Sequence, residues 1–346
     1  MTKIARIGID TSKSVFQLHG VDEAEQPVLK RKLRRREFLA FFERLAPTEI
    51  GLEACGGSHH WSRELHKLGH RVVLLPPQYV QPYVGRNKND AADASAICEA
   101  MSRPKVRERM VATKSAEQSA LQMMLGTRTG LIRRHTQLSN AIRGYAAEFG
   151  LVAAKGLAHI EPLLLRIAES DSVPTLAKEM FIELGKEFGA LGPRIAALER
   201  RLMAWHRGDE LSRRLAEIPA VGPIGACMLP AKIPDPRIFR SGRRCAAWIG
   251  LTAKDHSSGG KQKLGGITRA GDEALRAVLV SGATAYITQV RRGRTQPSPW
   301  LAELLKRKPP KLAAVALANK NARIAWKLMV SGQRYDRAHT ATLRAA

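Results

Sequence analysis

The chain has 346 residues, and 57 Lys and Arg stand against 31 Asp and Glu, which gives a formal net charge of +26. A chain of this length is expected to form two or more domains with sizeable cores. A positive surplus this large indicates a polyanionic partner, for which nucleic acid is the default. A membrane surface would also suit the charge, but no basic amphipathic helix with an aromatic face supports that alternative.

The cysteines and the N-terminal region exclude further classes. Cys55, Cys98, Cys227 and Cys245 are scattered without a CxxC spacing, so a zinc site or a disulfide framework is not expected. The sequence contains no signal peptide and no apolar run of transmembrane length. We therefore expect a cytoplasmic protein that works on nucleic acid in a reducing interior and has no membrane partner.

The first hundred residues predict a mixed sheet. Strands are expected over residues 4–10, 14–21, 28–33, 49–53 and 71–75, and helices over 36–45, 59–68 and from 90 past 101. Three strands joined by hairpins and then alternating helices and strands predict a sheet with helices on its faces, an α/β fold.

Four acidic residues form the candidate active site. Asp10 and Glu53 each end a predicted strand, and Asp90 and Asp93 are three residues apart at the start of a predicted helix. Asp90 alone could simply cap its helix. A carboxylate such as Asp10 at the end of an apolar strand, however, is disfavoured without a partner. Four gathered carboxylates would repel one another unless a hard divalent cation neutralised them, so Mg²⁺ is expected, with Mn²⁺ as the alternative.

This order of strands and acids resembles the RNase H fold in its RuvC-like form, over residues 4–103. In such folds an acid from strand one, an acid from strand four and acids from a late helix meet at a metal site. Two ions at that site would hold both the attacking and the leaving oxygen of a phosphodiester displacement.

Two long helices are predicted after a basic connector over residues 102–114. Ser115 and Gln118 have the spacing of a capping box, and the helix they open runs to about residue 149. Basic residues on this helix and beside the acidic pair are interpreted as nucleic-acid contacts: Arg86, Lys88, Arg128, Arg133, Arg134 and Arg143.

The second long helix, over residues 175–206, carries apolar residues at alternating spacings of four and three, which is typical of a coiled-coil seam: Leu184, Phe188, Leu191, Ile195, Leu198 and Leu202. Gly192-Pro193 is expected to kink it. The seam fits two helices packed within one chain as well as it fits a contact between subunits.

Residues 218–226 resemble the turn of a helix-hairpin-helix, in which Gly222 and Gly225 would free backbone N–H groups for a phosphate. A plain Gly/Pro connection between two helices is the alternative. Further helices are expected over residues 236–250, 272–290 and 310–330, and the tail over 336–346 is expected to be loose.

A polar, glycine-rich loop over residues 251–268 lies between two of these helices. It carries Ser257 and Ser258 before a glycine pair, with basic residues around them that are assigned to nucleic-acid binding: Lys254, Lys261, Lys263 and Arg269. A serine hydroxyl is a poor nucleophile without a base or a metal. From the residues alone, a loop that grips phosphate is the better interpretation.

Four histidines, His59, His60, His66 and His70, stand close together in the sequence. Three of them could share one helical face, as in a metal site. No other ligand type with suitable spacing lies in the same stretch, so a partly exposed helix is the better interpretation.

Five segments in order carry a resemblance to a known family: Ile-Gly-Ile-Asp-Thr-Ser-Lys (7–13), Leu-Glu-Ala-Cys-Gly (52–56), Arg-Asn-Lys-Asn-Asp-Ala-Ala-Asp-Ala (86–94), Ile-Pro-Ala-Val-Gly-Pro (218–223) and Trp-Ile-Gly-Leu-Thr-Ala-Lys-Asp-His-Ser-Ser-Gly-Gly (248–260). Together they resemble the DEDD transposases of the insertion-sequence-110 family across almost the whole chain. The sequence departs from many relatives at Ala253, where they have proline.

The resemblance implies a domain layout and a set of site residues. It implies a RuvC-like domain over residues 1–103, a helical coiled-coil-like linker over 104–210 and a C-terminal transposase domain over 211–335. The metal-binding acids would be Asp10, Glu53, Asp90 and Asp93. The nucleophile would be Ser258, with the adjacent Ser257 as the alternative.

The resemblance also implies the reaction and the partners. The expected activity is an RNA-guided DNA recombinase of a mobile element, which exchanges strands through a covalent phosphoserine intermediate. The expected partners are donor DNA, target DNA, a guide (bridge) RNA and further copies of the chain, as a dimer or tetramer on the nucleoid of a prokaryotic cell. In such a system base pairing selects the site while the protein grips backbone.

Three other functions remain open on the sequence. A junction-resolving nuclease would use water and the acids alone. A binding scaffold would have no activity. A sugar-kinase or actin-like ATPase would share the opening Gly-Ile-Asp-Thr, but no later adenosine-site glycine motif follows, and the charge argues against it.

Overall fold

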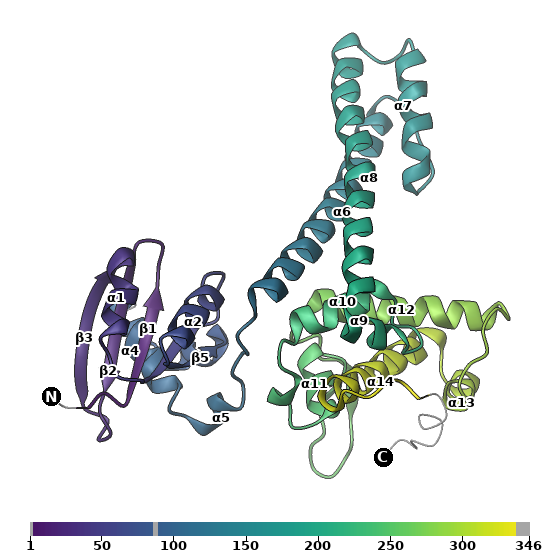
Figure 1. The fold of residues 1–346 in the computed structure, drawn as a ribbon. Helices are drawn as coiled ribbons and strands as arrows, with labels where there is room; N and C mark the ends of the chain where they lie inside the picture. The colour runs from purple at the N-terminus through teal and green to yellow at the C-terminus, as the bar shows by residue number, and fades with distance from the viewer. Residues whose placement is uncertain (1–2, 86–88, 337–346) are drawn as a thin grey trace.

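The computed structural model describes residues 3–85 and 89–336, which form a five-stranded sheet with helices, a long helical arm and a helical C-terminal part (Figure 1). The mixed α/β class and the mostly helical C-terminal part were both predicted from the sequence. The boundaries of the domains stay a prediction.

The sheet has the strand order β3-β2-β1-β4-β5. β1 (Arg6–Thr11) pairs antiparallel with β2 (Val15–Val21), and β2 pairs antiparallel with β3 (Pro27–Arg34). On its other side β1 pairs in parallel with β4 (Glu49–Glu53), which pairs in parallel with β5 (Arg71–Leu75). Each parallel pair needs a crossover connection, and helices supply it.

One face of the sheet packs against η1 (Arg35–Glu37), α1 (Phe38–Glu43) and α2 (Ser58–Lys67). Side chains alternate between the faces of a strand, so this face receives every second residue. Phe16 and Trp61 meet there with ring centroids 5.1 Å apart, within a cluster of fully or nearly buried aromatic rings.

The opposite face packs against α4 (Asp90–Ala100), which contacts β1, β2 and β4. Val73 and Leu75 of β5 join the buried cluster on this side. Short helical segments follow or precede α4: α3 (Pro77–Val80), η2 (Gln81–Tyr83) and α5 (Pro104–Arg107). The sheet is therefore the middle layer between two layers of helices.

The arm rises from the rest of the molecule as a group of packed helices (Figure 1). α6 (Ala116–Glu148) leads outward, η3 (Leu157–His159) and α7 (Ile160–Glu169) form the tip, and α8 (Thr175–Gly208) returns. The tip has a buried cluster of its own that joins all three α-helices.

The C-terminal part contains one further buried cluster, to which α6 and α8 also contribute. Its elements are α9 (Glu210–Ala216), α10 (Pro223–Lys232), η4 (Pro236–Ile238), α11 (Gly242–Ile249), β6 (Ala253–Asp255), β7 (Leu264–Ile267), α12 (Glu273–Arg291), α13 (Pro299–Arg307) and α14 (Pro310–Ser331).

Several local predictions are confirmed. Ser115 accepts a hydrogen bond from the Gln118 N–H (3.0 Å), and Gln118 Oε1 accepts one from the Ser115 N–H (2.9 Å), so the capping box opens α6. Phe188, Leu191 and Leu202 of the predicted seam are buried within this single chain, where α8 packs on α6. α8 continues through Pro193 as one helix, and the kink expected at Gly192-Pro193 stays a prediction.

Some helices in the described ranges were not predicted, among them the short α3 and α5 and the longer α7 and α13. α7 buries Ile160, Leu163 and Ile167, whose spacing is helical, but the segment is only 10 residues long. None of the helices in the described ranges is both long and apolar enough to cross a lipid bilayer.

Candidate active site and nucleic-acid contacts

Asp10 and Glu53 lie at the carboxyl ends of two adjacent parallel strands. Ile9 of β1 is in register with Leu52 of β4, so the next residue of each strand brings the two acids side by side. Ile9 and Leu52 are buried on the α1 face, which directs Asp10 and Glu53 toward the α4 face. Both acidic residues are half-buried.

Glycine allows α4 to lie directly on the sheet. A β-carbon on Gly8 would stand 2.3 Å from both the Ala94 carbonyl oxygen and the Cys98 backbone nitrogen. A β-carbon on Gly51 of β4 would stand 2.7 Å from Met101 Sδ. Any larger residue at Gly8 would therefore push the helix away from the sheet.

The same contacts bring the start of α4 to the acids. Ala94 of α4 lies over Gly8 of β1. From Ala94 back to Asp90 the helix rises about 6 Å, and from Gly8 forward to Asp10 the strand rises about 7 Å. Asp90 and Asp93 in the first turn therefore reach the level of Asp10.

Asn89 caps α4, because its side chain accepts a hydrogen bond from the Ala92 N–H (2.8 Å). This excludes the alternative in which Asp90 serves as the cap. The carboxylates of Asp90 and Asp93 also stand at the positive end of the helix, where anions are favoured.

The pKa of Asp10 shows that the four acids act on one another. Burial raises the pKa of Asp10, and the negative charges of Asp93, Asp90 and Glu53 raise it further, to about 6. Only a hydrogen bond from the Thr11 backbone lowers it. A cation at this place would relieve the repulsion, and oxygen ligands of this kind suit Mg²⁺.

Among the residues that the structure describes, no three His, Cys, Asp or Glu side chains already stand in an arrangement that could hold a metal ion. The four carboxylates are thus close enough to repel one another without converging on one point. Binding an ion requires these side chains to turn toward each other.

The serine loop is ordered as a β-hairpin, which differs from the loop expected from its composition. β6 pairs antiparallel with β7, and Ser258 bridges to Lys261 across the turn. The hydroxyl of Ser257 donates to Asp255 and accepts a hydrogen bond from the Lys263 N–H (3.0 Å). Short polar residues support the turn where composition alone suggested flexibility.

Ser257 and Ser258 consequently have different surroundings. Ser257 is held inside the turn, whereas the exposed Ser258 side chain forms no hydrogen bond with any residue in the described ranges. The basic residues predicted to bind nucleic acid are exposed around it: Lys254, Lys261, Lys263 and Arg269. Ser258 is therefore the more accessible hydroxyl of the pair.

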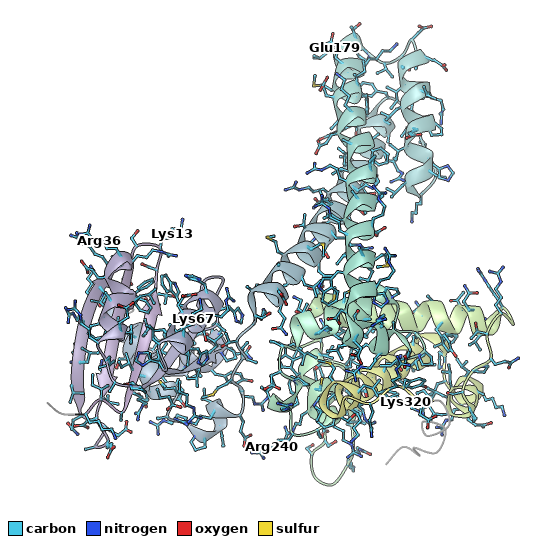
Figure 2. All side chains as sticks on the ribbon, in the orientation of Figure 1. Lys13, Arg36, Lys67, Glu179, Arg240 and Lys320 are labelled. Carbon is cyan, nitrogen blue, oxygen red and sulfur yellow. The ribbon has the colours of Figure 1, made fainter. Side chains whose placement is uncertain are left out.

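A groove of about 1380 Å³ begins at the base of this hairpin, at Leu251, Ala253 and Ile267, and continues along α14. Lys320, labelled in Figure 2, lies in it with Nζ 4.4 Å from the Trp300 ring centroid. Further basic residues line the groove: Arg243, Arg323, Lys327 and Arg334. Its charge suits an anion.

The predicted helix-hairpin-helix turn joins α9 to α10. Gly222 is exposed at the N-terminus of α10. Gly225 is buried, and a β-carbon there would meet Val278 of α12 at 3.4 Å. Gly225 is therefore turned into the core against α12, while Gly222 is the one of the two glycines that is exposed to a phosphate.

Two of the arginines assigned to nucleic acid have partners inside the protein. Arg128 donates to Glu199 Oε1 from Nε (2.9 Å) and Nη2 (2.5 Å), which joins α6 to α8. Arg143 donates to the carbonyl oxygens of Ala154 and Gly156. Both contacts hold the arm together. These contacts within the protein account for both arginines without a role in nucleic-acid binding.

Arg133 and Arg134 are exposed on α6, and they remain candidates for nucleic-acid contact. Arg86 and Lys88 lie outside the described residues. No local pattern indicated the Arg128–Glu199 pair, since its members are 71 residues apart.

The histidines have structural roles. His70 is buried between strands and helices, where Nδ1 accepts from the Thr48 N–H (3.2 Å) and Nε2 lies 3.0 Å from the Phe42 carbonyl oxygen. His59 Nδ1 accepts a hydrogen bond from the Lys114 N–H, and its pKa is lowered to about 4, first by burial. These histidines hold backbone groups. The partly exposed helix expected for them is α2, but His70 lies beyond its end and is buried, which corrects the expectation for that residue.

Comparison with known proteins adds an independent observation. The family profile described as "Transposase IS116/IS110/IS902 family" matches residues 212–297, and the DEDD transposase profile of the IS110 type matches residues 7–149. The chain is 36% identical to the transposase for insertion sequence element IS1111A of Coxiella burnetii, over 97% of this chain and 92% of that protein.

The chain belongs to the IS110 family of transposases. It is also 33% identical to the transposase for insertion sequence element IS1328 of Yersinia enterocolitica, over 96% of this chain and 98% of that protein. It is 61% identical to the y4pF/y4sB protein of Sinorhizobium fredii, over 97% of this chain and 87% of that protein. Membership implies an enzyme that cuts and rearranges DNA.

The two profiles cover the two parts of the transposase that carry the candidate residues. The DEDD profile contains all four acids, and the second profile contains Ser258 and Gly222. The resemblance seen in the sequence is thus confirmed at the level of the family.

Proposed function

We propose that this transposase is a Mg²⁺-dependent, RNA-guided DNA recombinase in which Ser258 is the nucleophile. The observation that carries the proposal is the gathering of four carboxylates at one end of the sheet, where burial first and then the other three negative charges raise the pKa of Asp10 to about 6. The strand order β3-β2-β1-β4-β5 supports a RuvC-like RNase H fold for the sheet.

Asp10, Glu53, Asp90 and Asp93 would hold Mg²⁺, or Mn²⁺ in its place. When bound, the ion neutralises the carboxylates and polarises the scissile phosphate. Asp10 must lose its proton for this role, and in the metal-free site burial and the neighbouring carboxylates raise its pKa to about 6, so below that pH protons would compete with the ion. The first turn of α4 holds the backbone of Asp90 and Asp93 at the level of Asp10, and their side chains would turn toward the ion.

Ser258 would carry out the strand cleavage. Its Oγ attacks the phosphorus atom, the Oγ–P bond forms, the P–O bond to one DNA strand breaks, and the serine proton leaves to solvent or a nearby base. The oxygen of the departing strand leaves as an alkoxide and takes up a proton, which gives a free hydroxyl. A hydroxyl of a second strand then attacks the phosphoserine in the reverse sense, which releases Ser258 and joins the DNA.

The hairpin suits this role because Ser257 supports the turn and leaves Ser258 exposed among lysines. Lys254, Lys261 and Lys263 would hold the phosphates on either side of the scissile bond. Contacts between these lysines and phosphates do not distinguish one base from another, which fits a system in which an RNA selects the sites.

The acids and Ser258 of one chain lie in separate parts of the molecule (Figure 1), because the hairpin hangs from the C-terminal part and the acids are on the sheet. We propose that a homo-oligomer closes the site, with the acids of one subunit meeting the serine of another. A dimer is the smallest assembly that allows this.

The partners of the assembly would be donor DNA, target DNA and a guide RNA from the same mobile element, on the nucleoid of a prokaryotic cell. The net charge of +26 supports binding to several nucleic-acid strands at once. Guidance by base pairing explains how a protein with scattered cations reaches defined sites.

A junction-resolving nuclease is the second candidate, and the separation of the acids from Ser258 within one chain favours it. Such an enzyme would use water as the nucleophile at the acidic cluster. It would cut DNA without an RNA and would leave free ends.

Strand exchange tests the proposal. The purified protein is incubated with Mg²⁺, donor DNA, target DNA and the non-coding RNA transcribed beside its gene. Joined products are expected only when the RNA loops match both DNAs. Free cut ends that form without RNA and never join would support the nuclease and contradict the recombinase.

A further inference from the structure

Strand β3 carries an unusual concentration of positive charge at the edge of the sheet. Six of the seven residues over 30–36 are Lys or Arg, and none of them was among the predicted nucleic-acid contacts. β3 is the outermost strand next to β2, so its second edge has no partner strand in the described sheet. These cations are exposed.

Alternation divides this charge between the two faces of the strand. Leu29 and Leu33 pack into the cluster on the α1 face, and Arg31 on the same side lies over the Phe41 ring at 5.2 Å. Lys30 and Lys32 must therefore lie on the opposite face. Arg34 follows them on that side.

The opposite face is the one that holds the acids. Lys32 is in register with Gln17 of β2, and Gln17 is in register with Asp10 of β1. Residues directly opposite one another in an antiparallel pair share a face. Lys32, Gln17, Asp10 and Glu53 thus form one row across four strands.

A second row supports this geometry. Lys30 is in register with His19, and the positive charge of Lys30 contributes to lowering the pKa of His19, after burial as the larger cause. Within the described ranges, neither Lys30, Lys32 nor Arg34 forms an ion pair. Their charges are therefore open to a partner outside the chain.

We propose that Lys30, Lys32 and Arg34 form a phosphate track on the acidic face of the sheet, which guides the DNA strand being cut to Asp10 and Glu53. This inference rests on the proposed function, because it takes the acids as the place of cleavage.

The dimensions suit a nucleic-acid backbone. Adjacent strands are about 4.8 Å apart, so the backbone of Lys32 lies about 10 Å from that of Asp10, roughly the axial rise of three nucleotides in one strand. An anionic strand would be repelled by four carboxylates unless nearby cations held it. The track supplies that charge two strands away from the acids.

The cationic surface continues at the same end of the sheet. Figure 2 shows Lys13 and Arg36 at the end where β1 finishes, and Arg35 Nη1 donates to the Lys13 carbonyl oxygen (3.3 Å). Lysine on an edge strand also discourages pairing between molecules. That simpler role predicts no loss of DNA affinity when the lysines are replaced.

Binding of a fluorescent oligothymidylate without divalent metal tests the track. The double variant Lys30→Gln/Lys32→Gln is compared with Arg31→Gln/Arg44→Gln, which removes the same charge from the α1 face of the same sheet. Each phosphate contact to a single strand changes the salt slope by about 0.7, so losing two contacts weakens binding about 25-fold at 0.1 M salt. The control should lose less than about threefold, since screening acts over about 10 Å.

Equal losses in the two double variants, or a loss for an RNA oligonucleotide alone, would overturn the track. If the first variant does not fold, Lys32→Gln alone should lose about fivefold, and Lys32→Arg should restore the affinity. A failed proposed function would look different: the oligonucleotide would bind as expected while no variant, including the wild type, cut or joined DNA.

Discussion

Gly8 of β1 lies against the backbone of Ala94 in α4, so closely that a β-carbon on Gly8 would stand 2.3 Å from the Ala94 carbonyl oxygen. This contact sets the height of α4 above the sheet. It therefore sets where Asp90 and Asp93 stand relative to Asp10. The arrangement of the acidic cluster thus depends on the absence of a side chain at Gly8.

Gly8→Ala should destabilise the protein by about 3 kcal/mol and abolish cleavage, because the new methyl group must displace helix backbone. Gly126→Ala is the matched control, since a β-carbon at Gly126 in α6 meets nothing within 4 Å. That control should gain about 0.5–1 kcal/mol from helix propensity. Urea unfolding measures both, and a Gly8→Ala protein of unchanged stability would refute the contact.

Asp10→Asn should raise the stability of the metal-free protein at neutral pH. The folded state holds the Asp10 proton up to a pH of about 6, whereas the unfolded state loses it near 4, so stability falls as the pH rises between these values. The gain from Asn is about 1 kcal/mol once solvent screening at this half-buried site is allowed for.

Metal binding should reverse that order. Mg²⁺ should raise the melting temperature of the wild type, because it binds only the folded acids, and should raise that of Asp10→Asn less. Mg²⁺ binding by the wild type should weaken as the pH drops below about 6, because protons then compete with the ion for Asp10. Thermal melts with and without Mg²⁺ measure the shift, and equal shifts in both proteins would show that Asp10 is not a ligand.

Arg128 and Glu199 should behave as one unit. Arg128→Gln and Glu199→Gln should each cost about 1 kcal/mol, because either change breaks the contact between α6 and α8. DNA and RNA affinity should then fall no more for Arg128→Gln than for Glu199→Gln. Filter binding measures these affinities. If only Arg128→Gln lost nucleic-acid affinity, Arg128 would be a nucleic-acid contact after all.

Mixing two inactive variants tests assembly of the site across subunits. Asp10→Asn and Ser258→Ala should each be inactive alone, and their mixture should recover strand exchange, since a mixed dimer contains one intact pair of acids and serine. Co-purification of the two variants through different affinity tags controls for subunit exchange. A mixture that stays inactive although the two variants co-purify would place the acids and the serine in the same subunit.

Local patterns predicted much of the fold. The alternation in β1 and the Ser115 capping box depend only on nearby residues, so the sequence alone was sufficient. The meeting of Asp10 with Glu53 was predictable too, because strand ends of parallel neighbours share one edge of the sheet. Asn89 as the cap of α4 was not predicted, although Asp90 next to it was considered for that role.

Features that depend on distant partners could not be predicted. The pairing of Arg128 with Glu199 and the packing of Gly225 on Val278 require knowledge of which helices meet. The division of the β3 cations between two faces requires the register with β2. The order of the serine hairpin depends on the contact of Ser257 with Asp255, which composition does not show.

The most direct measurement of the central claim is a trapped covalent adduct. The wild type is incubated with labelled DNA, the guide RNA and Mg²⁺, and then separated under denaturing conditions that keep only covalent complexes. The account predicts label on the wild-type protein and on Ser257→Ala, and none on Ser258→Ala with its RNA binding intact. A labelled protein band that persists in Ser258→Ala would contradict it.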